Sequence, residues 1–185
     1  EMDTKEQILQ ILEYFDLRIL VSESGRLVIN IGTTTLHESE FQVQTSYADG
    51  SWCGYSYSRC AQLNGPSLRF VEAKSRNLVE LNLDELIDSK DKSKFKPIRV
   101  SQPTKVNDFA VGKSGTVSCI SAKGQIWVSS PSTKQTVTLN AGAGFAFTCV
   151  AALNDKLIVS AHNRNEQQRT LFVLSESLSE LFRLS

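Results

Sequence analysis

The sequence has few histidines and cysteines, and it lacks the motifs that usually give them a chemical role. His37 and His162 are the only two histidines in 185 residues, and neither has a GxSxG motif or a cysteine-protease context beside it. Gly142 and Gly144 lack the third glycine and the helix of a dinucleotide fingerprint. We therefore expect a protein that is not an enzyme and that holds no cofactor.

The cysteines form no CxxC pair of the kind that binds zinc, so no metal site is expected. They are Cys53, Cys60, Cys119 and Cys149. Their wide spacing is unlike that of a small disulfide scaffold. We expect all four to be reduced thiols in the core of a cytoplasmic or nuclear protein.

The sequence also lacks an excess of charge and long hydrophobic runs. The 20 Lys and Arg balance the 20 Asp and Glu, so no overall field attracts phosphate or anionic lipid. The longest apolar stretches, such as 8–15 and 145–153, are far shorter than the roughly 20 residues of a membrane helix. The first residues are acidic and polar, unlike a secretory signal. We expect no membrane contact, and nucleic acid as a partner has no support from the net charge.

Residues 1–17 are predicted to form a short N-terminal amphipathic helix. Ile8, Ile11, Leu12 and Phe15 have the i, i+3, i+4, i+7 spacing that places side chains on one helix face. This apolar stripe must be buried, either on the rest of the chain or in a groove of a partner. The four residues are therefore candidate partner contacts.

From Leu17 onward, short β-branched and apolar runs alternate with Gly, Asn, Asp and Ser, which predicts strands joined by hairpins. The predicted strands are 18–21, 26–31, 40–45, 54–60, 67–73, 77–83, 106–111, 116–121, 125–129, 136–139, 147–152, 156–161, 170–174 and 179–184. The charged stretch 87–97 is predicted to be a solvated loop. The fold class is therefore all-β.

A pair made of an aromatic residue and valine occurs three times, each time ahead of a leucine at nearly the same interval. The three sets are Phe70-Val71 with Leu81, Trp127-Val128 with Leu139, and Phe172-Val173 with Leu184. Two further strands precede each of the last two pairs. The repeating unit therefore has four strands, and such internal periods are typical of repeat architectures.

These segments resemble blades of a degenerate WD-repeat β-propeller. Residues 156–161 look like a second blade strand, and 127–134 look like a third strand that enters a turn. Val128-Ser129 stands where the Trp-Asp pair of the family would stand, and Lys123 stands in place of a turn aspartate. The resemblance covers residues 98–185 and, more loosely, 54–83. It implies a propeller-like, incomplete ring of antiparallel four-stranded blades, with approximate blades 18–50, 51–86, 98–140 and 145–185.

The length of the chain suggests that the ring is incomplete. A blade takes about 40–45 residues, so the chain holds about three to four blades, whereas WD-type propellers usually close with about seven, within a general range of about 4–8. An open ring exposes apolar surface. Two explanations stay open. The chain is a fragment of a longer protein, which Glu1 before Met2 and the abrupt end at Ser185 favour, or a partner or second copy completes the ring.

The resemblance implies a protein-interaction scaffold or adaptor subunit of a multiprotein complex, because rigid blades present loops around a broad rim. The alternative is an RNA- or DNA-associated subunit. Its contacts would be the loop Lys90–Lys96, with Lys92, Lys94 and Lys96, and a strand that carries Tyr55, Tyr57 and Arg59. Bases stack on such tyrosines, but the same residues equally suit a packed sheet face.

Overall fold

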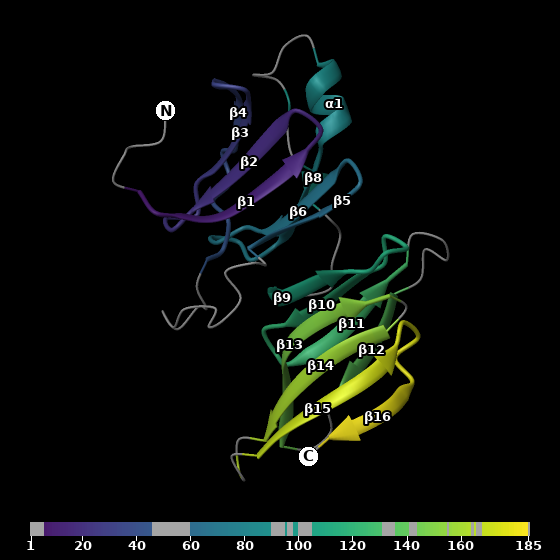
Figure 1. The fold of residues 1–185 in the computed structure, drawn as a ribbon. Coiled ribbons are helices and arrows are strands. Elements are labelled where there is room, and N and C mark those ends of the chain that lie inside the picture. The colour runs from purple at the N-terminus through teal and green to yellow at the C-terminus, as the bar shows by residue number, and fades with distance from the viewer. Residues whose placement is uncertain are drawn as a thin grey trace. The chain divides into compact units, whose positions relative to one another are not determined.

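The computed structural model describes residues 6–45, 60–89, 95, 98–99, 105–130, 136–140, 144–154, 156–163, 165 and 168–184. These residues form four antiparallel sheets of four strands each, together with one short helix (Figure 1). The chain divides into two compact units, Glu1–Pro103 and Thr104–Ser185. Each unit contains two of the sheets, and each sheet is a meander in which consecutive strands pair.

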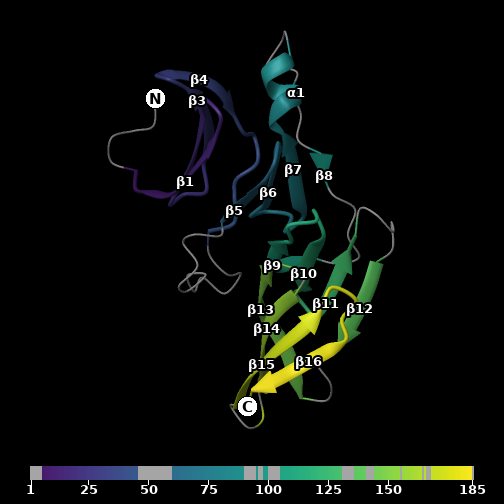
Figure 2. The same cartoon turned by 45° about the vertical axis from the view of Figure 1, so that its right-hand side comes forward.

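The first unit contains sheets one and two. The first sheet consists of β1 (Ile8–Tyr14), β2 (Leu17–Ser22), β3 (Leu27–Ile31) and β4 (Thr34–Glu38). The second consists of β5 (Ala61–Asn64), β6 (Ser67–Val71), β7 (Leu78–Asn82) and β8 (Ile98–Arg99). Helix α1 (Leu83–Asp88) continues directly from the end of β7 (Figure 2).

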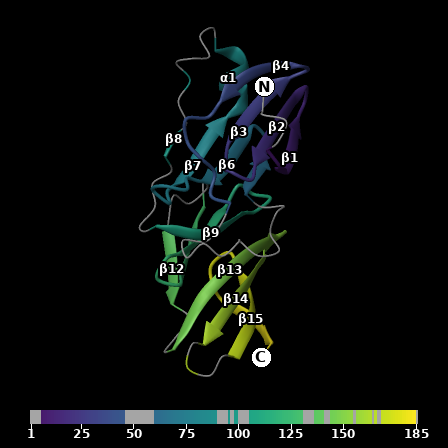
Figure 3. The ribbon, with the colours of Figure 1, turned by 90° about the vertical axis from the view of Figure 1, so that its left-hand side faces the viewer.

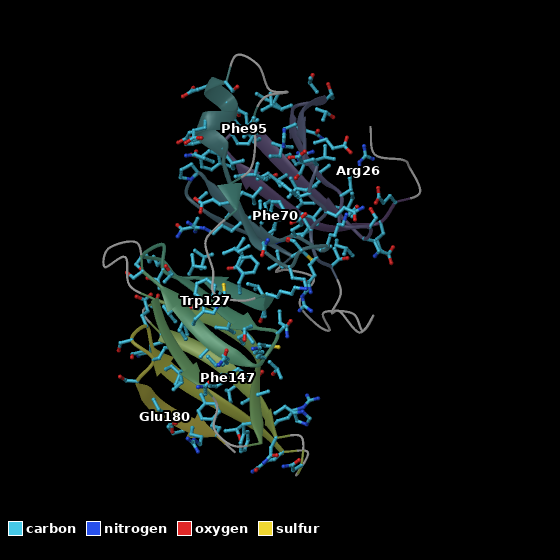
Figure 4. The ribbon with its side chains drawn as sticks, turned by 180° about the vertical axis from the view of Figure 1, so that it is seen from behind. Arg26, Phe70, Phe95, Trp127, Phe147 and Glu180 are labelled. Atoms are coloured by element: carbon cyan, nitrogen blue, oxygen red, sulfur yellow. The ribbon has the colours of Figure 1, made fainter. Side chains whose placement is uncertain are left out.

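Strand alternation builds the core of the first unit. Leu17, Ile19 and Val21 of β2 point to the same side and are all buried, as a period of two requires. They pack in one apolar cluster with Phe70 of the second sheet, which lies in the interior of the unit (Figure 4). One face of each sheet therefore forms the core that joins the pair.

The second unit contains sheets three and four. The third sheet consists of β9 (Val106–Val111), β10 (Val117–Ser121), β11 (Gln125–Ser129) and β12 (Thr136–Asn140). The fourth consists of β13 (Phe145–Leu153), β14 (Lys156–Asn163), β15 (Gln168–Ser175) and β16 (Glu180–Leu184). Strands β13, β14 and β15 lie side by side (Figure 3).

The core of the second unit contains side chains from both of its sheets. Ile120 and Ile126 of the third sheet pack in one cluster with Phe147 and Phe172 of the fourth. The two phenylalanine rings meet edge to face with centroids 5.8 Å apart, a favoured aromatic geometry. The repeat that the aromatic-Val pairs indicate thus corresponds to two similar sheets packed on each other.

The predicted N-terminal helix is wrong, because residues 8–14 form strand β1. Its backbone pairs with β2 from Ile8↔Ser22 to Tyr14↔Leu17, so the sheet satisfies the amide groups that a helix would have satisfied internally. Strand alternation turns Leu12 and Tyr14 toward the core. Phe15, with φ 50°, lies in the tight turn that follows. The first sheet accordingly begins at Ile8 and not at residue 18.

Most other predicted strands are confirmed to within a few residues, with two exceptions. Segment 40–45 carries only an isolated bridge between Val43 and Glu72. Segment 54–60 lies outside the described residues except for Cys60. Residues 83–88 form α1, although the charged stretch from residue 87 onward was expected to be a loop. Strands β4, β5 and β8 were not predicted.

Helix α1 begins with a capping pattern. The Asn82 side-chain oxygen accepts hydrogen bonds from the backbone amides of Asp84 at 3.1 Å and Glu85 at 3.3 Å. The two acidic residues in the first turn suit the positive end of the helix. Leu83 and Leu86 are fully buried, so the helix is fixed on the first unit by its apolar side.

Candidate interaction surfaces

A polar side chain, buried in the first unit and half-buried in the second, ties the first strands of neighbouring sheets together in each unit. In the first unit, Gln10 Nε2 donates to the Ala61 carbonyl at 2.8 Å, and Gln10 Oε1 accepts from the Ala61 amide at 2.8 Å. In the second unit, Asp108 Oδ2 accepts from the Val150 amide at 2.8 Å. A buried amide without a partner costs about 1–3 kcal/mol. These two contacts therefore help to hold adjacent sheets in register.

A glycine in the hairpin between the second and third strands makes a second tie in each unit. Gly25 has φ +83° and Gly124 has φ +73°. The Gly25 carbonyl accepts from the Val43 amide at 2.7 Å, and the Gly124 carbonyl accepts from the Phe147 amide at 3.0 Å. The same device thus links the first sheet to the segment that approaches the second, and the third sheet to the fourth.

Serine stabilises these hairpins. Ser121 Oγ accepts hydrogen bonds from the amides of Lys123 and Gln125, both at 3.2 Å, and Ser22 Oγ accepts from the Arg26 amide at 3.1 Å. Short hydroxyl side chains commonly stabilise turns in this way. Lys123, at the place of the turn aspartate of the WD-repeat family, therefore lies in a turn whose amides already have an acceptor.

The fourth sheet buries one face and exposes the other. On the inner face Val150, Val159 and Phe172 are at most 6% exposed. On the opposite face Phe182 is 54% exposed and Leu184 is 53% exposed. We call this opposite side the fourth-sheet face. Its residues are Cys149, Ala151, Leu153, Ile158, Ser160, Leu171, Val173, Phe182 and Leu184.

The fourth-sheet face is built of cross-strand rows. One row runs Ala151, Ile158, Val173, Phe182, and the next runs Cys149, Ser160, Leu171, Leu184. Apolar side chains thus fill one complete row and most of the second. Large apolar patches on monomeric proteins are uncommon and usually mark interaction sites.

The first sheet has a smaller apolar row on the side away from its core, which we call the first-sheet face. Ile11 pairs with Leu20, and Leu20 pairs with Val28. Ile11 is 57% exposed, but Leu20 is half-buried and Val28 is only 4% exposed, so the row is open at its Ile11 end alone. Beside this row Glu13 contacts Arg18 at 4.0 Å. The face is therefore apolar in its middle and charged at its side.

A third exposed surface lies at the β1–β2 hairpin, and we call it the hairpin-tip patch. Phe15 is 85% exposed, and its ring meets the Tyr14 ring edge to face at 4.7 Å. The Tyr14 hydroxyl donates to Asp84 Oδ1 at 2.8 Å, and this hydrogen bond raises the pKa of Tyr14. Ile87 of α1 is 44% exposed. The hydrogen bond joins the hairpin to the helix.

The structure separates the residues that the sequence grouped as one apolar stripe. Ile8 is half-buried, Leu12 packs against the core, and Ile11 and Phe15 are exposed at different places. Helical spacing would have put them on one side, whereas strand alternation divides them. The other candidate contacts lie outside the described residues: Lys92, Lys94 and Lys96 of the loop Lys90–Lys96, and Tyr55, Tyr57 and Arg59.

Within the described part of the chain, no group of His, Cys, Asp or Glu side chains could hold a metal ion, so neither histidine belongs to such a group. His37 is half-buried and packs edge to face on Phe95 at 5.5 Å. Burial lowers its pKa, although Glu40 and Glu38 oppose the effect. His162 is half-buried on β14, in register with Arg169.

Cys60 and Cys119 are buried and form no disulfide, as expected. The expectation that every cysteine is in the core is wrong for Cys149, which is exposed because it points to the fourth-sheet face. Cys53 lies outside the described residues. Among those residues, no helix has the length and apolar character needed to cross a membrane.

No family model and no curated protein sequence matches the chain. Solved structures do match its fold. The β-propeller domain of Cps50 (Swd1) from Myceliophteria thermophila has a TM-score of 0.59 and 13% identity over 91% of this chain and 53% of that one. The Pan2 WD40 domain of Neurospora crassa has a TM-score of 0.55 and 9% identity over 97% and 50%.

The chain thus spans about half the length of these propellers. The computationally designed Ika4 protein matches with a TM-score of 0.56 and 11% identity over 94% of both chains. Identities this low bear on the fold alone. Together with four meandering four-stranded sheets, they show that the chain has the fold of WD-repeat-like β-propeller blades.

Proposed function

We propose that the protein is a non-catalytic interaction scaffold or adaptor subunit of a multiprotein complex. The observation that carries this proposal is the hairpin-tip patch, where Phe15 is 85% exposed. An exposed aromatic ring held by its neighbours loses little conformational freedom on binding. Anchors of this kind dominate the energy of protein interfaces.

The surroundings of Phe15 favour a protein partner at this patch. Asp16 follows it, and Asp84, Glu85 and Asp88 are exposed on α1. Asp84 contacts the hairpin through Tyr14, and Glu85 and Asp88 lie on the same short helix. Carboxylates in such a setting repel the phosphates of nucleic acid. They suit a segment that combines an apolar anchor with Lys or Arg. The fitting partner is therefore a basic, partly apolar protein segment.

Affinity capture of the tagged chain from cells, with quantitative mass spectrometry, tests the proposal. The test variant is Phe15→Asn, because asparagine tolerates the positive φ of that position. The control is Ile31→Asn, since Ile31 is another exposed apolar residue of the first sheet, at 45%. We expect Phe15→Asn to reduce a defined set of partners at least tenfold, as the loss of an interface anchor does.

The control should retain those partners, and both variants should keep the melting temperature of the wild type within a few degrees. Equal recovery with Phe15→Asn and Ile31→Asn would show that the hairpin-tip patch holds no partner. A partner set consisting of RNA-dependent proteins, lost after nuclease treatment, would favour the nucleic-acid alternative instead.

A further inference from the structure

The joints inside the two units use the same face of the earlier sheet. Gln10 lies on the face of the first sheet that the second sheet covers, and Asp108 lies on the face of the third sheet that the fourth sheet covers. Each of these residues comes directly after a register shift in the first strand of its sheet. The position after the shift therefore marks the side on which the following sheet packs.

Cys149 holds the corresponding position in the fourth sheet. A register shift precedes it in β13, and it pairs with Ser160 of β14, as Asp108 pairs with Ile120 of β10. Cys149 is exposed and lies on the fourth-sheet face. The side of the fourth sheet on which the repeat would place a further sheet is thus the exposed side.

The fourth-sheet face is as large as the patches that proteins normally cover, but it is not a whole interface. Strands lie about 4.8 Å apart and rise about 3.3 Å per residue, so four strands of five residues present about 300 Å², comparable to the largest apolar patch on a typical monomer. A cover of this area alone would bury about 600 Å² in total, less than the roughly 1,200 Å² at the lower end of stable specific interfaces. The contact therefore has to extend to the margins of the face.

The two margins of the face carry positive charge. Lys156 and Arg169 are exposed. Each points outward, because the next residue on its strand, Leu157 or Thr170, is buried on the inner side. Arg169 is in register with His162, six residues from Lys156 along β14, so the two cations lie at opposite ends of the face, about 20 Å apart. Among the described residues on this side of the sheet, no carboxylate accompanies them.

The carboxylates of β16 and of the turn before it serve the inner side of the sheet. Glu180 is in register with Leu174, which is buried, and it pairs with Arg183 at 2.7 Å. Glu176 accepts a hydrogen bond from the Ser114 hydroxyl of the third sheet at 3.2 Å. The described margins of the fourth-sheet face therefore keep their positive charge.

This charge pattern discriminates between occupants. Two copies of the chain that met through their fourth-sheet faces would place Lys156 and Arg169 of one copy opposite the same cations of the other, and like charges across an interface repel. Carboxylates at the same spacing would attract them. A sheet suits the flat apolar rows, because stacked sheets pack about 10 Å apart through such rows, as the inner face already does on the third sheet.

We propose that the fourth-sheet face binds a β-sheet of a different protein, in which carboxylates on both sides of an apolar row meet Lys156 and Arg169. The thiol of Cys149 is only a weak hydrogen-bond acceptor, so the partner has to supply the polar ties that Asp108 supplies between the third and fourth sheets. On one partner strand, the spacing corresponds to acidic residues six positions apart with apolar residues at the two same-face positions between them. This surface is separate from the hairpin-tip patch and adds a second partner to the proposed scaffold.

Carbodiimide coupling tests the proposal, because this reagent joins a lysine amine directly to a carboxylate. After coupling in extracts of cells that express the tagged full chain, capture and mass spectrometry should find Lys156 joined to Asp or Glu of a partner strand with the stated pattern. Phe182→Glu should reduce recovery of that partner at least tenfold. Lys156→Glu should reduce it about fivefold or more, and Lys156→Arg should retain it.

Lys123→Glu is the matched control, because Lys123 is an exposed lysine of the third sheet; it should retain the partner. All variants should keep the melting temperature of the wild type within a few degrees, and Lys156→Glu carries the test should Phe182→Glu fail to fold. Replacement of the coupled partner carboxylate by lysine should weaken binding to the wild type and restore binding to Lys156→Glu. If this exchange restores nothing, the proposed charge pairing is wrong.

Alkylation of Cys149 gives a second readout, since a cover on the fourth-sheet face should protect this exposed thiol at least tenfold in the captured complex relative to the purified chain. Equal alkylation, or equal recovery of every partner with wild type, Phe182→Glu and Lys156→Glu, overturns the proposal. So does a purified chain of twice 20.5 kDa that Phe182→Glu makes monomeric, because the face would then belong to a second copy. Phe15→Asn should leave this partner bound, and Phe182→Glu should leave the partners of the hairpin-tip patch bound, so either proposal can fail alone.

Discussion

Replacement of Gly25 by alanine tests how the two sheets of the first unit are joined. Gly25 has φ +83°, and a Cβ added to it would lie 2.2 Å from the Val43 carbonyl oxygen. That oxygen belongs to the backbone of the residue whose amide donates to the Gly25 carbonyl at 2.7 Å. Alanine therefore has to displace the segment that the glycine holds.

The cost can be worked out from three contributions. An L-residue in the left-handed region costs about 1–2 kcal/mol, overpacking adds about 1–3 kcal/mol, and loss of the hydrogen bond adds about 1 kcal/mol. We expect Gly25→Ala to lower the free energy of unfolding of the first unit by about 3–6 kcal/mol, which is a large part of the 5–15 kcal/mol of a typical domain.

Gly32→Ala is the matched control, because Gly32 has φ +56° and would bring its Cβ within 4 Å of no other atom. It should cost only the backbone contribution of about 1–2 kcal/mol. Urea titration with hydrogen exchange of peptides from residues 60–89 measures the first unit separately. Equal destabilisation by the two variants would refute the reasoning, since the close approach to Val43 would then contribute nothing.

Two further predictions concern the second unit and pH. The Asp108 carboxylate now accepts a hydrogen bond from the Val150 amide at 2.8 Å, and Asp108→Asn can place a side-chain NH2 group opposite that amide. We expect the free energy of unfolding of the second unit in urea to fall by about 1–3 kcal/mol. No loss would show that this contact does not hold the sheets. Because burial lowers the pKa of His37 below its ordinary 6.5, the unfolded chain binds more protons, so the stability of the first unit should fall as pH drops from about 7 through 6.5. His37→Asn should flatten that dependence in thermal melts, and an unchanged slope would assign it to other groups.

The sequence predicts the second unit better than the first, and the reason lies in its strands. From residue 106 onward nearly every strand has a dense apolar run, so the alternation of the side chains and the length of the run both indicate a strand. In the first unit β4 reads Thr-Thr-Leu-His-Glu, which is almost entirely polar, and β8 has only two residues. Edge strands such as these are defined by pairing with a neighbour, which composition does not reveal.

The first strand shows how a tertiary contact overrides local spacing. Helical periodicity in Ile8, Ile11, Leu12 and Phe15 competes with alternation through Gln10, and the pairing with β2 decides for the strand. A comparison of two hairpins in the sequence would have identified β1 as a strand. Ser22 and Gly25 have the same spacing as Ser121 and Gly124, which places β1 in the position of β9.

Helix α1 could also have been predicted. Asn82 followed three residues later by Glu85 is a capping pattern, and Asn82 Nδ2 also donates to Glu85 Oε1 at 3.2 Å. The preceding strand pattern conceals this start, because Leu83 continues the apolar run of β7. The candidate contacts at the hairpin tip were only partly foreseen, since Phe15 was chosen for helical spacing and is exposed because it occupies a turn.

The arrangement of the ties between sheets accounts for the exposed faces. Gln10 and Asp108 lie in the first strand of a sheet, and Gly25 and Gly124 lie in the hairpin between its second and third strands. In the second unit, Glu176 of the β15–β16 turn also accepts hydrogen bonds from the Ser114 and Thr116 hydroxyls of the β9–β10 hairpin, both at 3.2 Å. The remaining surface of each sheet can then be apolar without leaving amides unsatisfied. An apolar face joins neighbours well, but it discriminates poorly between them. Register and partner choice therefore depend on the few polar ties, and a sheet that covers the fourth-sheet face must bring comparable ties of its own.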